Sequence, residues 1–275
     1  MTLKAAVAQG EKLLNDSGVP AARLTAEVLL AHALRQERVY LISHSGDELG
    51  DTARIHFGRY LHERVQGKPT QYVTRRQEFY GRVFYVAPGV LIPRPETELL
   101  VETLVTRLQP GQRVLDVGVG SGCICATLAL ETRAQLFGTD ISADALRIAA
   151  RNVDTLRAPV LLAQGDLVQA FAPASLDAVV SNPPYVPESD RATLAPEVRE
   201  WEPEGALFAG RDGLDAYRRL VPDAARVLRP GGLLAFEFGF GQSPAIQELL
   251  REWDGVEVHS DLAGIPRFAL ARRAN

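Results

Sequence analysis

Cysteine is scarce in this chain, with only Cys123 and Cys125 among its 275 residues. Two cysteines this close cannot form a disulfide framework. They also lack the set of Cys and His partners that a zinc site requires. We therefore expect both to be small residues in the core of a helix, and we expect no metal cofactor.

Long hydrophobic runs and an excess of basic residues are also absent. No apolar stretch could span a bilayer, and the start at Met1 lacks the hydrophobic region of a signal peptide. The formal net charge of −4 gives no overall basic footprint for nucleic acid. These absences predict a cytoplasmic protein with no membrane partner and no direct nucleic-acid partner. The 46% hydrophobic content is ordinary for a globular chain.

The chain divides into three parts by its patterns. Residues 1–70 carry apolar residues at helical spacing, which predicts a small bundle of four or five helices suited to docking a partner. Residues 71–92 are rich in aromatic and β-branched residues around Gly81, which predicts a β-hairpin that links two domains. Residues 93–275 form the third part, which we expect to be the catalytic domain.

The third part alternates strands and helices. Apolar runs predict strands at 113–117, 135–140, 160–164, 176–181 and 233–238, with two more near 256–260 and 267–271. Helical patterns fill the gaps at 122–132, 143–153 and 214–228, and an apolar helical stripe covers 99–108. Such alternation predicts an α/β fold with a mostly parallel sheet of seven strands, covered by helices on both faces.

A glycine-rich loop follows the first of these strands. Asp116 is followed by glycines at 118, 120 and 122, whereas the dinucleotide fingerprint would place its third glycine at position 123, where the chain has Cys123. An acidic residue fits poorly beside a pyrophosphate but can receive a cationic amino group. The loop therefore favours S-adenosylmethionine (AdoMet) over NAD. The expected cofactor-binding residues here are Asp116, Gly118, Val119, Gly120, Ser121 and Gly122.

Two further strand ends carry acidic residues. Asp140 lies about twenty residues beyond the glycines, where a carboxylate can accept hydrogen bonds from both ribose hydroxyls. Asp166 follows the third strand and is placed to meet the adenine amino group. Each feature alone is also common turn chemistry. Together with a fourth polar strand end they favour a binding site.

That fourth strand end is the sequence Asn182-Pro183-Pro184-Tyr185. Prolines lack an N–H and fix φ, so this turn exposes backbone carbonyls in a rigid arrangement. A planar NH2 group needs two such acceptors and a ring against its face. Ligands of doubly wound sheets bind between the first and fourth strands, which places Asn182 beside the glycine loop and the cofactor. The alternative is a proline-rich surface turn with an ordinary Asn cap.

With these residues collected, the chain resembles the protein-(glutamine-N5) methyltransferases that modify peptide chain release factors. The resemblance covers nearly the whole chain. It rests on the segments 78–81, 91–98, the glycine loop, 140–142, 165–166, 181–185, 202–203 and 213–214, which read EFYG, LIPRPETE, DVGVGSG, DIS, GD, SNPPY, EP and GL. The segment PRPETE and the helical N-terminal domain are its most selective features.

The resemblance implies a Rossmann-like class I methyltransferase domain, AdoMet as methyl donor and S-adenosylhomocysteine as product. It implies class 1 release factors as partners, held in part by the N-terminal domain, with the glutamine of their Gly-Gly-Gln loop as substrate. In this family the residue after Asp166 lies against the adenine and is often aromatic. Leu167 stands there in this chain, so stacking is expected to be weaker, and Val119 stands where Thr is common.

The resemblance also implies roles for the residues of the Asn-Pro-Pro-Tyr motif. We expect Asn182, Pro183 and Tyr185 to be catalytic and all four residues of the motif, Pro184 included, to bind the substrate. In this hypothesis the Asn182 side-chain oxygen and the Pro183 carbonyl accept the two amide N–H bonds, while Tyr185 packs on the amide face. No Ser-His-Asp base is evident, so positioning carries much of the catalysis.

Several alternatives stay open at the level of sequence. The same motif occurs in adenine-N6 methyltransferases acting on DNA or RNA, although this chain lacks their recognition region and basic channel. A catalytically silent AdoMet-binding protein is a third possibility. Glu237 could line the pocket or be a buried structural carboxylate. Arg94 and Glu96 could close over the cofactor or form an interdomain salt bridge.

Overall fold

The computed structural model describes residues 1–274, which form two compact units. The first unit comprises Met1–Arg76 and Ala195–Trp201, and the second comprises Gln77–Leu194 and the chain from Glu202 onward. The break in the first unit means that a short segment from the middle of the α/β region folds with the N-terminal helices.

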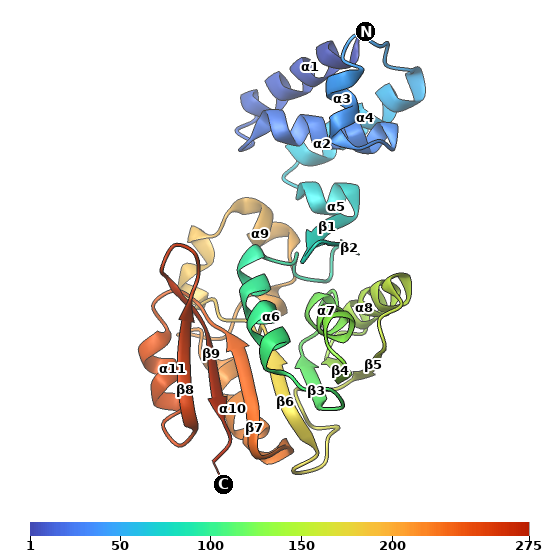
Figure 1. Ribbon diagram of the computed structural model, residues 1–275. Coiled ribbons are helices and arrows are strands. Elements are labelled where there is room, and N and C mark those ends of the chain that lie inside the picture. The colour runs from blue at the N-terminus through green and yellow to red at the C-terminus, as the bar shows by residue number, and fades with distance from the viewer. Residues whose placement is uncertain (275) are drawn as a thin grey trace. The chain divides into compact units, whose positions relative to one another are not determined.

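The first unit is helical throughout, as expected. Its helices are α1 (Leu3–Asp16), α2 (Ala22–Leu34), α3 (Arg38–Ser43), α4 (Asp51–Val65), α5 (Thr70–Thr74) and α9 (Pro196–Trp201) (Figure 1). Thr2 caps α1 by accepting a hydrogen bond from the backbone N–H of Ala5. Gly10 lets α1 and α4 approach closely, because a Cβ there would lie 2.7 Å from the ring of Phe57.

Helix α9 is attached to this unit by charge and by an aromatic ring. The Arg64 guanidinium of α4 is almost fully buried and forms an ion pair with Glu197 of α9. The ammonium of Lys68 lies 5.8 Å from the centre of the Trp201 ring. A buried Arg requires such a partner, because an unpaired charge would be costly to remove from water. No local pattern predicts this pairing, because its partners are far apart along the chain.

The hairpin predicted within residues 71–92 is confirmed. Its strands are β1 (Arg76–Phe79) and β2 (Arg82–Tyr85). The two turn residues, Tyr80 and Gly81, both have positive φ, at 50° and 68°. Positive φ at both positions is the signature of a type I′ turn, whose twist matches that of the flanking strands.

The second unit is built on the expected seven-stranded, mostly parallel sheet. Its order is β5-β4-β3-β6-β7-β9-β8, with only β9 running antiparallel to its neighbours β7 and β8. The strands are β3 (Arg113–Val117), β4 (Gln135–Asp140), β5 (Val160–Gln164), β6 (Leu176–Ser181), β7 (Leu228–Glu237), β8 (Asp254–Ser260) and β9 (Pro266–Arg272). Strand order reverses between β3 and β6, so their carboxyl ends are the predicted place for a ligand.

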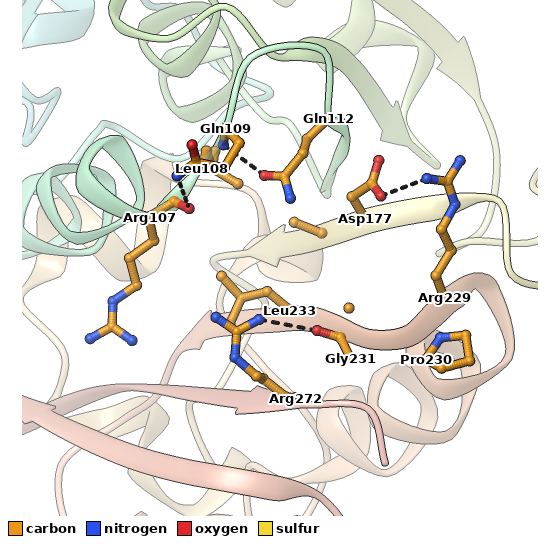
Figure 2. Close-up of a pocket in the computed structure, with 12 residues that line it drawn as sticks. Arg107, Leu108, Gln109, Gln112, Asp177, Arg229, Pro230, Gly231, Leu233 and Arg272 are labelled. Atoms are coloured by element: carbon orange, nitrogen blue, oxygen red, sulfur yellow. Dashed lines mark hydrogen bonds and ion pairs between the residues drawn. The ribbon is translucent and has the colours of Figure 1, made fainter. Parts of the chain in front are cut away.

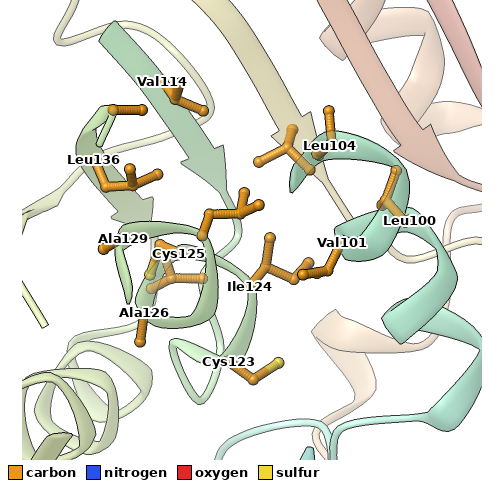
Figure 3. Close-up of a cluster of buried hydrophobic side chains, with 14 of the residues drawn as sticks. Leu100, Val101, Leu104, Val114, Cys123, Ile124, Cys125, Ala126, Ala129 and Leu136 are labelled. Carbon is orange, nitrogen blue, oxygen red and sulfur yellow. The ribbon is translucent and has the colours of Figure 1, made fainter. Parts of the chain in front are cut away.

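Helices cover both faces of this sheet (Figure 1). One face carries α6 (Pro95–Arg107), α7 (Cys123–Glu131) and α8 (Ala143–Leu156), and the other carries α10 (Asp215–Val227) and α11 (Ser243–Leu249). Figure 3 shows the first interface, where Leu100, Val101 and Leu104 of α6 face Ile124 of α7. Both cysteines are free and buried in this region, as expected. None of the helices described between residues 1 and 274 is long and apolar enough to cross a membrane.

Most predicted elements match the structure within a few residues. Four strands have the predicted bounds, whereas β7 starts at Leu228 rather than at 233. The sequence patterns predict neither α5, α9 and α11 nor the short 3-10 helices at Glu188–Thr193 and Glu204–Ala206. These elements have seven residues or fewer, too short for a helical period to stand out.

Candidate active site

The carboxyl ends of β3 and β6 are held side by side. Val117 pairs with Ser181 in the parallel register, and the Ser181 hydroxyl donates a hydrogen bond of 2.8 Å to the Val117 carbonyl. Gly118 and Asn182 are the next residues on each strand. The predicted glycine loop and the predicted Asn-Pro-Pro-Tyr motif are therefore brought together.

The backbone of the glycine loop is fixed by its neighbour strand. The N–H groups of Gly118 and Val119 both donate to the Thr139 carbonyl, at 2.8 and 3.0 Å. The N–H of Gly120 donates to the Asp140 carboxylate at 2.9 Å. Gly118 and Gly120 have φ of 73° and 53°, a left-handed conformation that favours glycine. The loop is thus rigid before any ligand binds.

A cavity of about 330 Å³ opens at these strand ends. Ten of the thirteen predicted site residues line it: Gly118, Val119, Gly120, Ser121, Asp140, Asp166, Leu167, Asn182, Pro183 and Pro184. The other three, Asp116, Gly122 and Tyr185, do not line it. The cavity also has walls that the sequence analysis did not assign, among them Thr97, Ile141, Ala216 and Arg219.

Gly122 has a packing role in the structure. Its φ is 79°, and a Cβ built on it would lie 3.2 Å from the Cβ of Ala149 on α8. Glycine here lets the start of α7 approach α8. The third glycine of dinucleotide-binding loops also serves close packing, but there it lets the helix approach the strand rather than a second helix.

Asp116 is fully buried beneath the loop. One carboxylate oxygen accepts a hydrogen bond of 3.1 Å from the Cys125 N–H, and the other has no partner within residues 1–274. Burial raises the pKa of Asp116 to about 7, and the nearby charge of Asp140 adds to that rise. A direct contact between Asp116 and a cofactor amino group stays a prediction.

Asp140 at the end of β4 and Asp166 after β5 differ in their hydrogen-bond and ion-pair partners. Both oxygens of Asp140 accept backbone hydrogen bonds, from Gly120 and from Ser142, and each oxygen keeps a lone pair. One oxygen of Asp166 is paired with the Arg219 guanidinium at 2.6 Å. Leu167 adopts a positive φ of 51°, and its carbonyl accepts from the Thr139 hydroxyl at 2.9 Å. A non-glycine residue in this conformation is uncommon and indicates a locally constrained loop.

The Asn182 side chain is the polar centre of the site. Its Nδ2 donates a hydrogen bond of 3.1 Å to the Thr97 hydroxyl. Its Oδ1 is buried and has no hydrogen-bond partner in the described chain. A buried amide oxygen without a partner is costly, so this atom is suited to receive a donor from a bound molecule.

Tyr185 is directed away from the cavity. Its side chain packs against the hydrophobic core on the α10 face of the sheet, and its hydroxyl lies 3.4 Å from Glu237 Oε1. Burial raises the pKa of its hydroxyl above the ordinary value, so the phenol stays protonated. Contact between the Tyr185 ring and a substrate amide therefore stays a prediction.

The contacts of Glu237 and Arg94 bear on the roles that the sequence left open for these two residues. Glu237 does not line the cavity, and it accepts hydrogen bonds from Thr97 and Tyr185. Arg94 lines the cavity and forms an ion pair of 2.6 Å with the buried Glu202. Both partners of that pair belong to the second unit, so the pair is not the interdomain salt bridge considered from sequence.

A second cavity of about 420 Å³ lies at the opposite ends of the strands (Figure 2). Its lining includes Arg107, Asp177, Arg229 and Arg272, and no predicted site residue. Arg229 pairs with Asp177, and Arg272 donates to the Gly231 carbonyl. No group of three or more His, Cys, Asp or Glu side chains suited to a metal was found within residues 1–274.

The catalytic unit is similar to known methyltransferases in sequence and in fold. The family model described as the methyltransferase small domain matches residues 95–198. A solved methyltransferase from Pyrococcus furiosus has 18% identity, covers 72% of this chain and 91% of its own, and gives a TM-score of 0.54. The Thermus thermophilus 16S rRNA N2 G1207 methyltransferase has 22% identity, covers 72% and 49%, and gives 0.53. The fold is that of a Rossmann-like methyltransferase.

Relatives that match nearly the whole chain identify its family. The release factor glutamine methyltransferase of Koribacter versatilis is 42% identical over 99% of both chains, and that of Moorella thermoacetica is 43% identical over 99% of both. The PrmC N-terminal domain model also matches residues 5–74. This chain belongs to the release factor glutamine methyltransferase family.

Proposed function

We propose that this enzyme transfers the methyl group of AdoMet to the side-chain amide nitrogen, N5, of the glutamine in the Gly-Gly-Gln loop of class 1 release factors. The observation that carries this proposal is the unpartnered Asn182 Oδ1, buried at the wall of the cavity beside the glycine loop. Family membership supports the release factor as substrate, and the N-terminal helical unit is proposed to help hold it.

The residues around the cavity fit AdoMet. Gly118 has open space where a Cβ would stand, so a ligand can approach the backbone closely. Asp140 has spare lone pairs for hydroxyl donors, and Val119, Ile141 and Leu167 offer an apolar lining. The cofactor supplies an electrophilic methyl group on a positively charged sulfur. Asp116, close beneath the loop, contributes negative potential on that side of the site when it is ionised.

In this proposal the protein activates the substrate amide nitrogen by holding it in position. An amide nitrogen is a weak nucleophile because its lone pair is delocalised into the carbonyl. Asn182 Oδ1 accepts one amide N–H and the Pro183 carbonyl accepts the other, which orients the nitrogen and favours positive charge developing on it. The new N–C bond forms as the S–C bond breaks, and the nitrogen then loses one proton to solvent. Alignment of two bound reactants can contribute about 7–11 kcal/mol.

The test is a methyl-transfer assay with site mapping. The purified protein is incubated with methyl-labelled AdoMet and a class 1 release factor, and the products are examined by peptide mass spectrometry. We expect one added methyl on the Gly-Gly-Gln glutamine and none on a release factor whose glutamine is replaced by alanine. Parallel incubations with DNA and RNA test the adenine alternative. Label in nucleic acid alone, or in no product, would refute the proposal.

A further inference from the structure

A chain of buried hydrogen bonds connects Asn182 to a carboxylate outside the cavity. Asn182 Nδ2 donates to Thr97 Oγ1 at 3.1 Å, and Thr97 Oγ1 donates to Glu237 Oε2 at 2.6 Å. Thr97 and Glu237 are 2% and 3% exposed. The three residues come from the loop after β6, the first turn of α6 and the end of β7. Three separate elements therefore meet at one hydroxyl group.

The direction of these bonds follows from the number of protons available. An ionised carboxylate only accepts, so the single hydroxyl proton of Thr97 is donated to Glu237. The Thr97 oxygen can then only accept from Asn182, which requires the NH2 end of the amide to face it. The two ends of an Asn amide are nearly identical in shape, and the hydrogen-bond network decides between them.

We propose that Thr97 and Glu237 are positioning residues that hold the Asn182 amide with its oxygen toward the acceptor nitrogen. This inference rests on the proposed function of Asn182 as a clamp for a substrate N–H. Were the amide turned over, its NH2 would meet the NH2 of the substrate and no hydrogen bond could form. The network therefore selects the one orientation in which the clamp works.

The protonation of Glu237 adds a way to test the direction. Burial raises the pKa of Glu237 to about 7 and Glu96 adds to the rise, while the hydrogen bond from Thr97, the Tyr185 hydroxyl and Arg267 oppose it. Tyr217 also faces this residue, through a hydrogen bond from its hydroxyl to the Glu237 backbone carbonyl. A protonated Glu237 can donate to the threonine hydroxyl, which frees that hydroxyl to donate to the Asn182 oxygen. Protonation would thus favour the turned-over amide.

A hydrogen bond between Thr97 and Glu237 that only stabilised the packing of α6 on β7 would look the same in the structure. The tests therefore measure AdoMet binding and turnover separately. Thr97→Val keeps the shape of the side chain and removes its hydroxyl. Thr127→Val is the matched control, because Thr127 is equally buried in α7 and its hydroxyl has no partner in the described chain. Thr97→Ser restores a hydroxyl and serves as the rescue.

We expect Thr97→Val to lower kcat about 10- to 100-fold, the cost of a misdirected buried hydrogen bond, with the Kd for AdoMet changed less than about twofold. Thr97→Ser and Thr127→Val should stay within about threefold of wild type. If Thr97→Val turns over as fast as Thr127→Val, the proposal is overturned. Urea unfolding of each variant identifies any loss that comes from the fold.

The pH dependence of kcat provides a second test. With a Glu237 pKa of about 7, wild-type kcat should be about tenfold lower at pH 6 than at pH 8. Glu237→Gln keeps an acceptor for Thr97 and cannot titrate, so its kcat should fall less between pH 8 and pH 6 than that of wild type, and any fall that remains reports other groups such as Asp116. Identical pH profiles of kcat for wild type and Glu237→Gln, with a fall in both, would overturn the proposal that Glu237 directs the Asn182 amide.

A measurement without substrate separates this inference from the proposed function. In protein labelled with 15N at asparagine, the Asn182 NH2 protons should exchange slowly with solvent in wild type and at least about tenfold faster in Thr97→Val. Such a change in a protein that fails to methylate release factor would refute the function and leave the network standing. Equal exchange in both proteins, with methylation intact, would refute the network alone.

Discussion

Gly118 and Gly122 belong to the same loop, and the structure predicts opposite effects for alanine at the two positions. Both have left-handed φ, at 73° and 79°, so an alanine is strained at either. Gly118 lines the cavity and has no atom within 4 Å of the position of a Cβ, whereas a Cβ at Gly122 would lie 3.2 Å from Ala149. One substitution should therefore damage binding, and the other should damage stability.

A control glycine separates backbone strain from packing. Gly264 has a φ of 78°, lies exposed, and has open space around its Cβ position. Gly264→Ala should therefore cost only the left-handed strain of about 1–2 kcal/mol. Gly118→Ala should cost the same. Gly122→Ala adds about 1–3 kcal/mol of overpacking, for a total of about 2–5 kcal/mol.

The assays are urea unfolding and calorimetric titration with AdoMet. Gly118→Ala should raise the Kd for AdoMet about tenfold or more, because its methyl group enters the cavity, and Gly264→Ala should leave the Kd unchanged. Gly122→Ala should show the largest loss of unfolding free energy of the three. If Gly122→Ala and Gly264→Ala lose equal stability, the packing argument is wrong. If Gly118→Ala binds AdoMet normally, the assignment of the cavity is wrong.

Three further predictions concern polar residues of the site. Asn182→Ala should reduce kcat about 100-fold, with the Kd for AdoMet within about threefold of wild type; equal losses in both would contradict its role as a substrate clamp. Asp116 has its folded pKa raised to about 7, so unfolding releases a proton near neutrality and stability falls as pH rises. Between pH 6 and 8 wild type should lose about 1.4 kcal/mol relative to Asp116→Asn in urea unfolding, and a constant difference would show that Asp116 does not titrate there. Arg219→Ala should weaken AdoMet binding less than about tenfold and change unfolding free energy by less than about 1 kcal/mol, because its ion pair with Asp166 is partly exposed. A loss of more than about 2 kcal/mol would mean that this pair holds the fold together.

The parts of the fold that could be predicted are those with local signals. Strands such as β3 and β6 are mostly apolar runs, and a glycine directly after β3 and a proline two residues after β6 mark where each strand stops. The switch point between them followed from general rules for parallel sheets. By contrast, α9 folds with the N-terminal helices through Arg64 and Glu197, which are 133 positions apart. No local pattern carries information about such a pair.

The same limit explains what the sequence could and could not reveal about the site. Glycines, strand-end aspartates and the Asn-Pro-Pro-Tyr motif mark the cavity, because each has a local chemical meaning. Gly122 packs on α8 and is outside the cavity lining, so its contact with the cofactor stays a prediction. Tyr185 packs against the core on the α10 face, and its contact with the substrate stays a prediction. The neighbours of these two residues are set by tertiary packing, which no local pattern carries.

Thr97 shows why a motif alone does not define how a site works. It lies within the segment Pro93–Glu98, where the sequence suggests roles for Arg94 and Glu96 and none for Thr97. In the structure its hydroxyl connects Asn182 with Glu237, residues 85 and 140 positions away from it. The motif supplies an amide, and an amide can either accept or donate. Because an ionised Glu237 takes the hydroxyl proton of Thr97, the Asn182 oxygen is left to accept. Loss of the Thr97 hydroxyl, or protonation of Glu237, would therefore remove this control of the clamp while leaving every residue of the motif in place.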